Sequence, residues 1–107
     1  MMKEVQNAVY SLVSTRGKGC YVILCHAVDI ALAYQPDMPQ MRTIYQEICL
    51  RTKKHTPSAV AKALDRAAKD IWLHGKREAL HEYWIEEAPT AKELVCLIST
   101  KLWIEKQ

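Results

Sequence analysis

Apolar residues recur along this chain mostly at intervals of three and four, the spacing of helices that bury one face. We predict no strand. The predicted helices span residues 4–15, 20–34, 41–52, 57–74, 76–87 and 90–104. At 107 residues, the chain has the length of one domain. We therefore predict an all-α fold, a compact bundle of five to six helices in a single domain covering residues 1–107.

The stretch from 20 to 34 differs from the others because it is apolar on most sides, which predicts the central buried helix of the bundle. Two polar residues interrupt it, His26 and Asp29. They lie three positions apart, so they pair with each other or reach solvent, and we assign them no catalytic role. No apolar run approaches the ~20 residues of a membrane span.

The stretch from 51 to 77 carries the charge of the chain. It holds eight Lys/Arg and two Asp, a local net charge of +6, whereas the whole chain has +3. Thr56, Pro57 and Ser58 form a helix-start signal, with Thr56 as N-cap and Pro57 at the first helical position, or with a start one residue later. Gly75 is the stop signal. The two faces of the predicted helix are an apolar one (Val60, Ala63, Leu64, Ala67, Ile71, Trp72) and an outward one (Ser58, Ala59, Lys62, Asp65, Arg66, Lys69).

A helix at 41–52, a short polar turn and this basic helix together have the outline of a helix-turn-helix, at about residues 42–75. Phosphate backbones are the commonest partner of such a basic patch. A solvated helix surface is the alternative. For DNA binding, we expect phosphate contacts from Lys53, Lys54, Thr56 and Ser58, flanking contacts from Arg51, Lys76 and Arg77, base-edge contacts from Ala59, Lys62, Asp65 and Arg66, and Lys69 on the same face.

Two shorter signals follow. Leu80, Tyr83 and Trp84 are expected to point inward from the 76–87 helix. Thr90 and Glu93 fit a capping box at the start of the last helix. Trp72, Trp84 and Trp103 are interpreted as core residues.

The chain offers little sign of enzyme chemistry. Its four cysteines (20, 25, 49, 96) form no CxxC pair and are interpreted as reduced core thiols. We find no nucleophile–base spacing and no metal motif, so we predict a non-enzyme with no cofactor and no metal. The N-terminus lacks the pattern of a signal peptide, and we expect a cytoplasmic protein that does not associate with membranes.

Two ordered sets of residues carry a resemblance to a known family. The first comprises IYQEIC (44–49), TPSAV (56–60) and the core face and ending of the basic helix (63–75); the second is APTAKELVCLISTKLWIE (88–105). Tyr21, Leu24, Ala27 and Val28 add a looser match. These residues resemble the C-terminal DNA-binding effector domain of the master sporulation response regulator of endospore-forming bacteria.

This resemblance implies an all-helical domain with its recognition helix in the major groove, and double-stranded DNA and a second copy (a homodimer) or a related regulator as partners. The family's base-reading order Arg-Val-Glu-Arg-Ala-Ile-Arg is replaced here by Ala-Val-Ala-Lys-Ala-Leu-Asp over 59–65. Only Lys62 keeps a positive charge among the outward positions, and Asp65 reverses one. The family's operator is therefore not carried over. The alternative is an interaction adaptor, or an antagonist of a related regulator, that has lost specific DNA reading.

Overall fold

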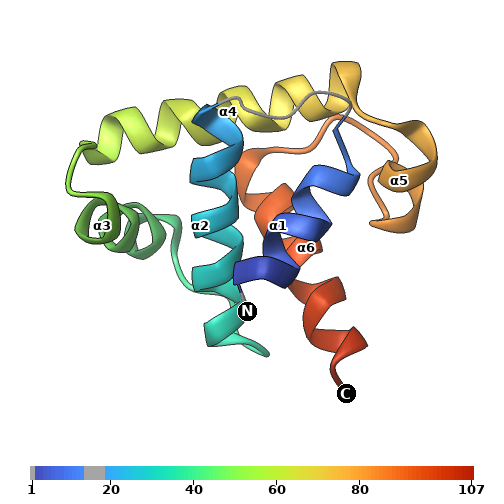
Figure 1. Cartoon of the computed structure of the whole chain (residues 1–107), viewed down its shortest axis with the longest axis horizontal. Helices are drawn as coiled ribbons and strands as arrows, with labels where there is room; N and C mark the ends of the chain where they lie inside the picture. The colour runs from blue at the N-terminus through green and yellow to red at the C-terminus, as the bar shows by residue number, and fades with distance from the viewer. Residues whose placement is uncertain (1, 14–18) are drawn as a thin grey trace.

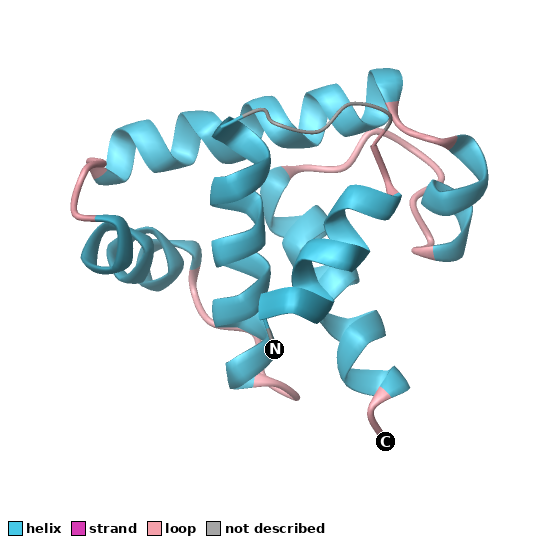
Figure 2. Ribbon diagram, viewed as in Figure 1, coloured by secondary structure: helices cyan, strands magenta, loops and turns pink. Residues whose placement is uncertain are grey.

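The computed structural model describes residues 2–13 and 19–107 of the chain, and within them it contains helices and loops but no strand (Figures 1 and 2). The helices are α1 (Met2–Ser11), α2 (Gly19–Tyr34), α3 (Met41–Thr52), α4 (Pro57–His74), α5 (Arg77–Glu82) and α6 (Ala91–Glu105). The predicted all-α fold is confirmed.

Helix α2 is the centre of the bundle, as its composition predicts. Ten of its sixteen residues are buried, and α1, α3, α4 and α6 all contact it. Tyr21 near its N-terminal end is 2% exposed and donates a hydrogen bond to Asp70 of α4, while its ring meets that of Tyr10 edge to face at 6.4 Å between centroids. This contact ties α1, α2 and α4 together.

Helices α3 and α4 have the predicted bounds, and α4 starts in the first of the two registers. Thr56 is the N-cap, with its hydroxyl accepting from the backbone N–H of Ala59 at 3.2 Å, and Pro57 is the first helical residue. The predicted core face is confirmed at Val60, Leu64, Ala67 and Ile71, which are fully buried, whereas Ala63 and Trp72 are only partly buried. Helix α4 lies across the top of the molecule in Figure 1, where its other face is uncovered by the remaining helices.

The predicted first helix is too long at its C-terminal end. Helix α1 ends at Ser11 rather than at residue 15. The chain leaves the helix because the Leu12 carbonyl accepts a hydrogen bond from the backbone N–H of Lys76 at 3.0 Å, so it joins the far end of α4 instead of a further turn of α1. The sequence also predicts a break between the first two helices at Arg16-Gly17-Lys18-Gly19, of which residues 16–18 lie outside the described residues and Gly19 begins α2.

The predicted helix over 76–87 is also too long, because α5 ends at Glu82. Trp84 has φ 61°, and the backbone N–H groups of Trp84 and Ile85 donate to the carbonyls of His81 and Leu80. This is a Schellman ending, in which a left-handed residue stops the helix. The prediction that Trp84 points inward is wrong: the reversal buries Ile85 instead and leaves Trp84 52% exposed.

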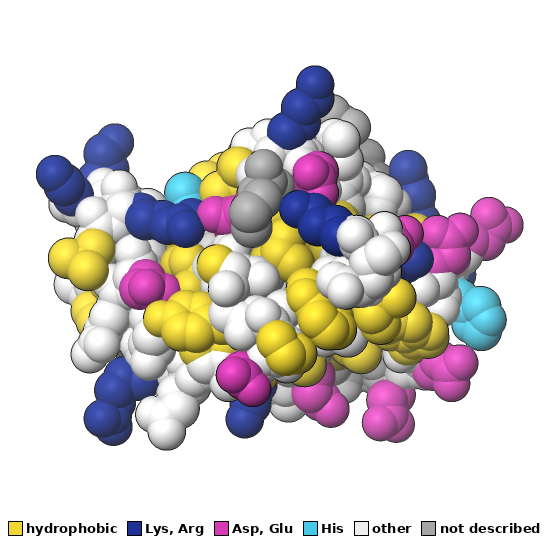
Figure 3. Space-filling model, turned by 90° about the horizontal axis from the view of Figure 1, so that it is seen from below, with side chains coloured by type: hydrophobic (Ala, Val, Ile, Leu, Met, Phe, Trp, Pro, Cys, Tyr) yellow, Lys and Arg dark blue, Asp and Glu magenta, His cyan; other side chains and the backbone are white. Residues whose placement is uncertain are grey.

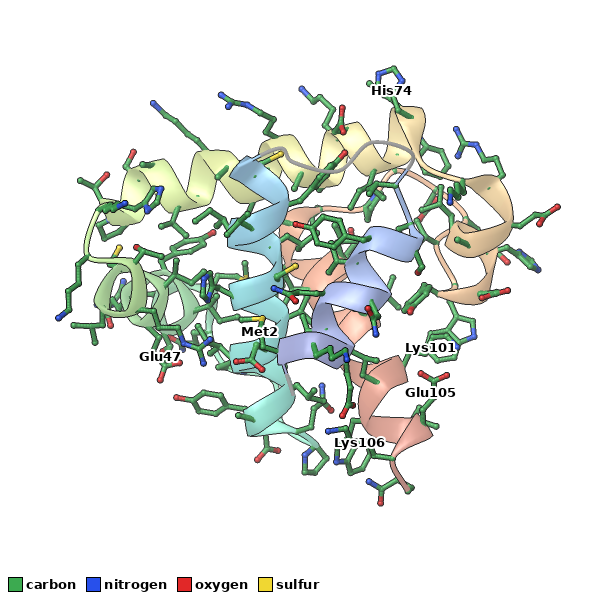
Figure 4. The ribbon with its side chains drawn as sticks, viewed as in Figure 1. Met2, Glu47, His74, Lys101, Glu105 and Lys106 are labelled. Atoms are coloured by element: carbon green, nitrogen blue, oxygen red, sulfur yellow. The ribbon has the colours of Figure 1, made fainter. Side chains whose placement is uncertain are left out.

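Helix α6 begins with the predicted capping box. The Glu93 N–H donates to the Thr90 hydroxyl at 3.1 Å, and the Glu93 carboxylate accepts from the Thr90 N–H at 2.9 Å, which lowers the pKa of Glu93. At its other end, Lys101, Glu105 and Lys106 project from neighbouring positions (Figure 4), and Lys106 pairs with Glu4 of α1 at 3.3 Å. The last helix is thus fixed at both ends.

Gly75 ends α4, but a left-handed conformation is not the reason. Its φ is −73°, which any residue can adopt. A Cβ built at this position would lie 2.4 Å from the Ile71 carbonyl oxygen and 2.8 Å from that of Leu12. A glycine is required here because the ends of α1 and α4 approach so closely.

We expect Gly75→Ala to lower the free energy of unfolding by about 1–3 kcal/mol, since the added methyl group must push two backbone segments apart. Urea denaturation followed by circular dichroism measures this change. Gly19→Ala is the matched control, because a Cβ at Gly19 meets nothing within 4 Å. Equal stabilities of the two variants would contradict this account of Gly75.

Candidate nucleic-acid interface

The outward face of α4 is exposed to solvent and carries several cations. Lys62 and Lys69 are seven residues apart, about two turns, so their side chains leave the helix in nearly the same direction. Ser58 and Asp65 lie on the same face of the helix. We call Ser58, Lys62, Asp65 and Lys69 together the crest of α4. All ten candidate residues from the sequence (Arg51, Lys53, Lys54, Thr56, Ser58, Ala59, Lys62, Asp65, Arg66, Lys69) are exposed.

The turn that leads into α4 adds two lysines at the N-terminal end of the crest. Lys53 is the C-cap of α3 and has φ 57°, the left-handed conformation that reverses the chain. Its backbone N–H donates to the Cys49 carbonyl at 2.9 Å. The first amides of a helix lack intrahelical acceptors, so the start of α4, with Lys53 and Lys54 in the turn before it, favours an anion.

A hollow lies on each side of the crest. The α2-side hollow, about 560 Å³, is lined by Gly19, Cys20 and Ile23 of α2, Ala63 and Arg66 of α4, and His55 of the turn. The α6-side hollow, about 450 Å³, is mainly apolar, and its lining includes Asp65, Lys69, Trp72, Leu73, Pro89 and Thr90. The structure therefore separates Arg66 from Asp65 and Lys69, which the sequence pattern places on one common face.

Arg51, Lys76 and Arg77 are not part of the crest. The guanidinium of Arg51 turns toward α2 and pairs with Asp29 at 2.8 Å, and it lies 3.4 Å from Nδ1 of His26. Arg77 stacks over the Trp72 ring at 4.6 Å. Of the two alternatives for His26 and Asp29, pairing with each other or reaching solvent, neither describes the main contact, because both residues contact Arg51.

The environment of His26 disfavours its charged form. Burial lowers its pKa, the positive charge of Arg51 lowers it further, and Asp29 opposes both effects. A neutral His26 leaves Arg51 with a single charged partner, Asp29. This pair holds the end of α3 against α2, and so it fixes the position from which the turn to α4 begins.

Acidic residues gather at the other end of the molecule. Figure 3, which views the chain from below, shows several acidic side chains collected on the side of α5, whereas the basic side chains are spread more widely over this face. Glu82, Glu86 and Glu87 are all exposed around Trp84. The sequence analysis missed this acidic, aromatic surface. The run EYWIEE (82–87) carries this surface, with three glutamates around Trp84. Because α5 ends at Glu82, helical spacing does not predict the direction of Trp84.

Other chemistry is sparse in the part of the chain that the structure describes. There, no three His, Cys, Asp or Glu side chains come close enough to hold a metal ion. Burial raises the pKa of the Cys25 thiol to about 11, so this thiol stays protonated at neutral pH. Over the same residues, no helix has the length and apolar character needed to cross a bilayer.

Searches of protein-family models, curated proteins and solved structures found no match to this chain. The likeness to the sporulation effector domain is therefore carried by the residues quoted above and stays a prediction.

We expect Lys53→Gly to raise the free energy of unfolding by about 1 kcal/mol, because glycine adopts the left-handed conformation without the Cβ clash that lysine suffers. Lys54→Gly is the matched control: it removes the same charge one position away, where the backbone has no positive φ. Urea denaturation of both variants measures the difference. A Lys53→Gly protein no more stable than Lys54→Gly would mean that Lys53 is not strained.

Proposed function

We propose that this chain is a double-stranded DNA-binding transcriptional regulator in which α3 and α4 form a helix-turn-helix. The observation that carries this proposal is the cationic crest of α4, with the lysines of the preceding turn, on a helix whose opposite face is fully buried. A helix fixed in this way presents its exposed side chains as a rigid set. Rigid placement favours recognition of a regular partner such as a duplex.

The dimensions of α4 suit the major groove. An α-helix with its side chains is about 10–12 Å across, and the major groove of B-DNA is about 12 Å wide. With α4 in the groove, Lys53, Lys54, Thr56 and Ser58 lie at the end nearest the backbone and contact phosphates. Lys62 donates to guanine, and Asp65 accepts from cytosine N4.

Asp65 sets a limit on this mode of binding. It lies on the crest between Lys62 and Lys69, so it lowers the local positive charge and is repelled by a nearby phosphate. In the centre of the groove, a carboxylate instead selects cytosine over bases that lack a donor there. One copy makes few such contacts, and a second copy or a related regulator supplies the remaining affinity.

The first prediction concerns salt dependence. Binding to random-sequence duplex should weaken steeply with salt, because each phosphate contact releases a counterion. The variant Lys53→Glu/Lys54→Glu/Lys62→Glu should lower the slope of log K against log salt by about 2 in magnitude, because Lys53 and Lys54 contact phosphates at about 0.9 each, whereas Lys62 contacts a base. Fluorescence anisotropy with a labelled duplex at several salt concentrations measures it.

The matched control reverses three exposed cations outside α4 that form no ion pair with a described residue, in the variant Lys3→Glu/Arg42→Glu/Lys92→Glu, which has the same net charge. This control should keep most of the slope. If both variants lose it equally, binding follows net charge rather than the crest. A folded wild type that binds no duplex at low salt would remove the proposal.

A second candidate function is binding of a partner protein, as an adaptor or antagonist of a related regulator. The exposed Trp84 favours it. An aromatic residue in the left-handed region costs about 1–2 kcal/mol of backbone strain, and glycine or asparagine is usual at this position. Here the strained residue is half exposed, is ringed by glutamates, and lies beside a hollow of about 240 Å³ whose lining includes Ile85, Pro89 and Leu97.

This second candidate predicts a charge-dependent contact at position 84. A photo-reactive amino acid in place of Trp84 should cross-link in cells to one protein through a Lys/Arg-rich segment. Glu86→Lys/Glu87→Lys should abolish the adduct, because the acidic ring attracts that segment. The same amino acid at exposed Gln6 of α1 is the control. Adducts from both positions, or one that survives the charge reversal, would count against this candidate.

A further inference from the structure

The two sides of α4 differ in charge, and this difference bears on how a duplex is held. On the α2 side, Arg66 and His55 line the hollow, and no carboxylate lines it among the described residues. On the α6 side, Lys69 is accompanied by Asp65, and the remaining lining is mainly apolar. Glu86, Glu87 and Glu93 follow the same edge of the molecule, close to Pro89.

The direction of Arg66 separates it from the crest. At 100° per residue, it lies roughly 70° around the helix axis from the middle of the crest. It shares the α2-side hollow with Ala63, one turn before it. A side chain at this angle leaves the groove floor, where base edges lie, and reaches the wall of the groove, which is the phosphate backbone.

Arg66 also has its charge available. It forms no ion pair with any residue that the structure describes, whereas Arg51 is held by Asp29 and Arg77 lies over Trp72. A guanidinium offers two parallel N–H donors that match two phosphate oxygens. The His55 ring, with its Nδ1 3.1 Å from the Thr52 hydroxyl, stands across the same hollow.

We propose that Arg66 binds a backbone phosphate seated in the α2-side hollow, rather than a base edge, and that each copy of the chain thereby holds one DNA strand more firmly than the other. This inference rests on the proposed DNA binding and deepens it. It also changes the sequence-based expectation for Arg66 and for Ala59, which lies still further around the helix from the crest, so that the residues that read bases are then Lys62 and Asp65.

The test is a double-mutant cycle between protein and DNA. A duplex selected by the wild type is rebuilt with single neutral methylphosphonates, one position at a time on each strand. One phosphate, or two adjacent ones, on a single strand should weaken wild-type binding about tenfold when neutralised, the loss expected for one charge-assisted hydrogen-bonded contact. Arg66→Ala should bind uniformly more weakly, with a salt slope lower by about 1, and should be insensitive to that same phosphate.

Lys62→Ala is the matched control, since it removes a cation one turn away on the crest. It should remain sensitive to the phosphate but lose preference at one base pair. The inference is overturned if Arg66→Ala instead loses preference at a base pair, or if neutralised phosphates on both strands couple to Arg66 equally. Those results would leave DNA binding itself intact. A folded wild type that binds no duplex would overturn both proposals, and circular dichroism establishes that each variant is folded.

Discussion

The covering of α2 on nearly every side is the constraint on which the rest of this structure depends. A helix that is apolar on most sides is unstable in water, so α1, α3, α4 and α6 each pack one face against α2. Because α4 runs across the N-terminal end of α2 rather than alongside it (Figure 1), α2 covers only part of α4. Its remaining length is anchored by Gly75, whose lack of a side chain lets the ends of α1 and α4 touch. This arrangement leaves one side of α4 in solvent along its whole length.

The charges follow from the same arrangement. Four elements bury their apolar stripes against α2, and the lysines and arginines that lie in α4 and in the turn before it can occupy only the uncovered side. Some of these cations are engaged elsewhere: Arg51 with Asp29, and Arg77 with Trp72. The cations that remain exposed lie in the turn, on the crest and beside the α2-side hollow. His74, at the far end of α4, projects away from the body of the molecule (Figure 4). The acidic residues lie at the opposite end, where α5 reverses into Trp84.

Two backbone positions show where local geometry conflicts with residue type. Lys53 and Trp84 both occupy the left-handed region that glycine adopts without cost. Lys53 starts the turn that aims α4, and Trp84 ends α5 with its ring exposed. Lys53 therefore belongs to the basic end of the molecule and Trp84 to the acidic end. Each of the two candidate functions uses one of these ends. DNA binding draws on the turn and α4, and partner binding draws on the surface around Trp84.

The sequence by itself determined the helices, because apolar periodicity, the Thr56-Pro57 start and the Thr90–Glu93 capping box are local signals that act within one or two turns. It also determined that α2 is central and that α4 has one buried and one charged face. Where α1 and α5 end was decided by tertiary contacts: the Leu12 carbonyl bonds to Lys76, and Ile85 is buried in preference to Trp84. The separation of Arg66 from Asp65 and Lys69 also required the fold. Spacing along a helix gives the direction of a side chain, but the neighbours that α2 and α6 place on either side of α4 are distant in the sequence, and only packing brings them there.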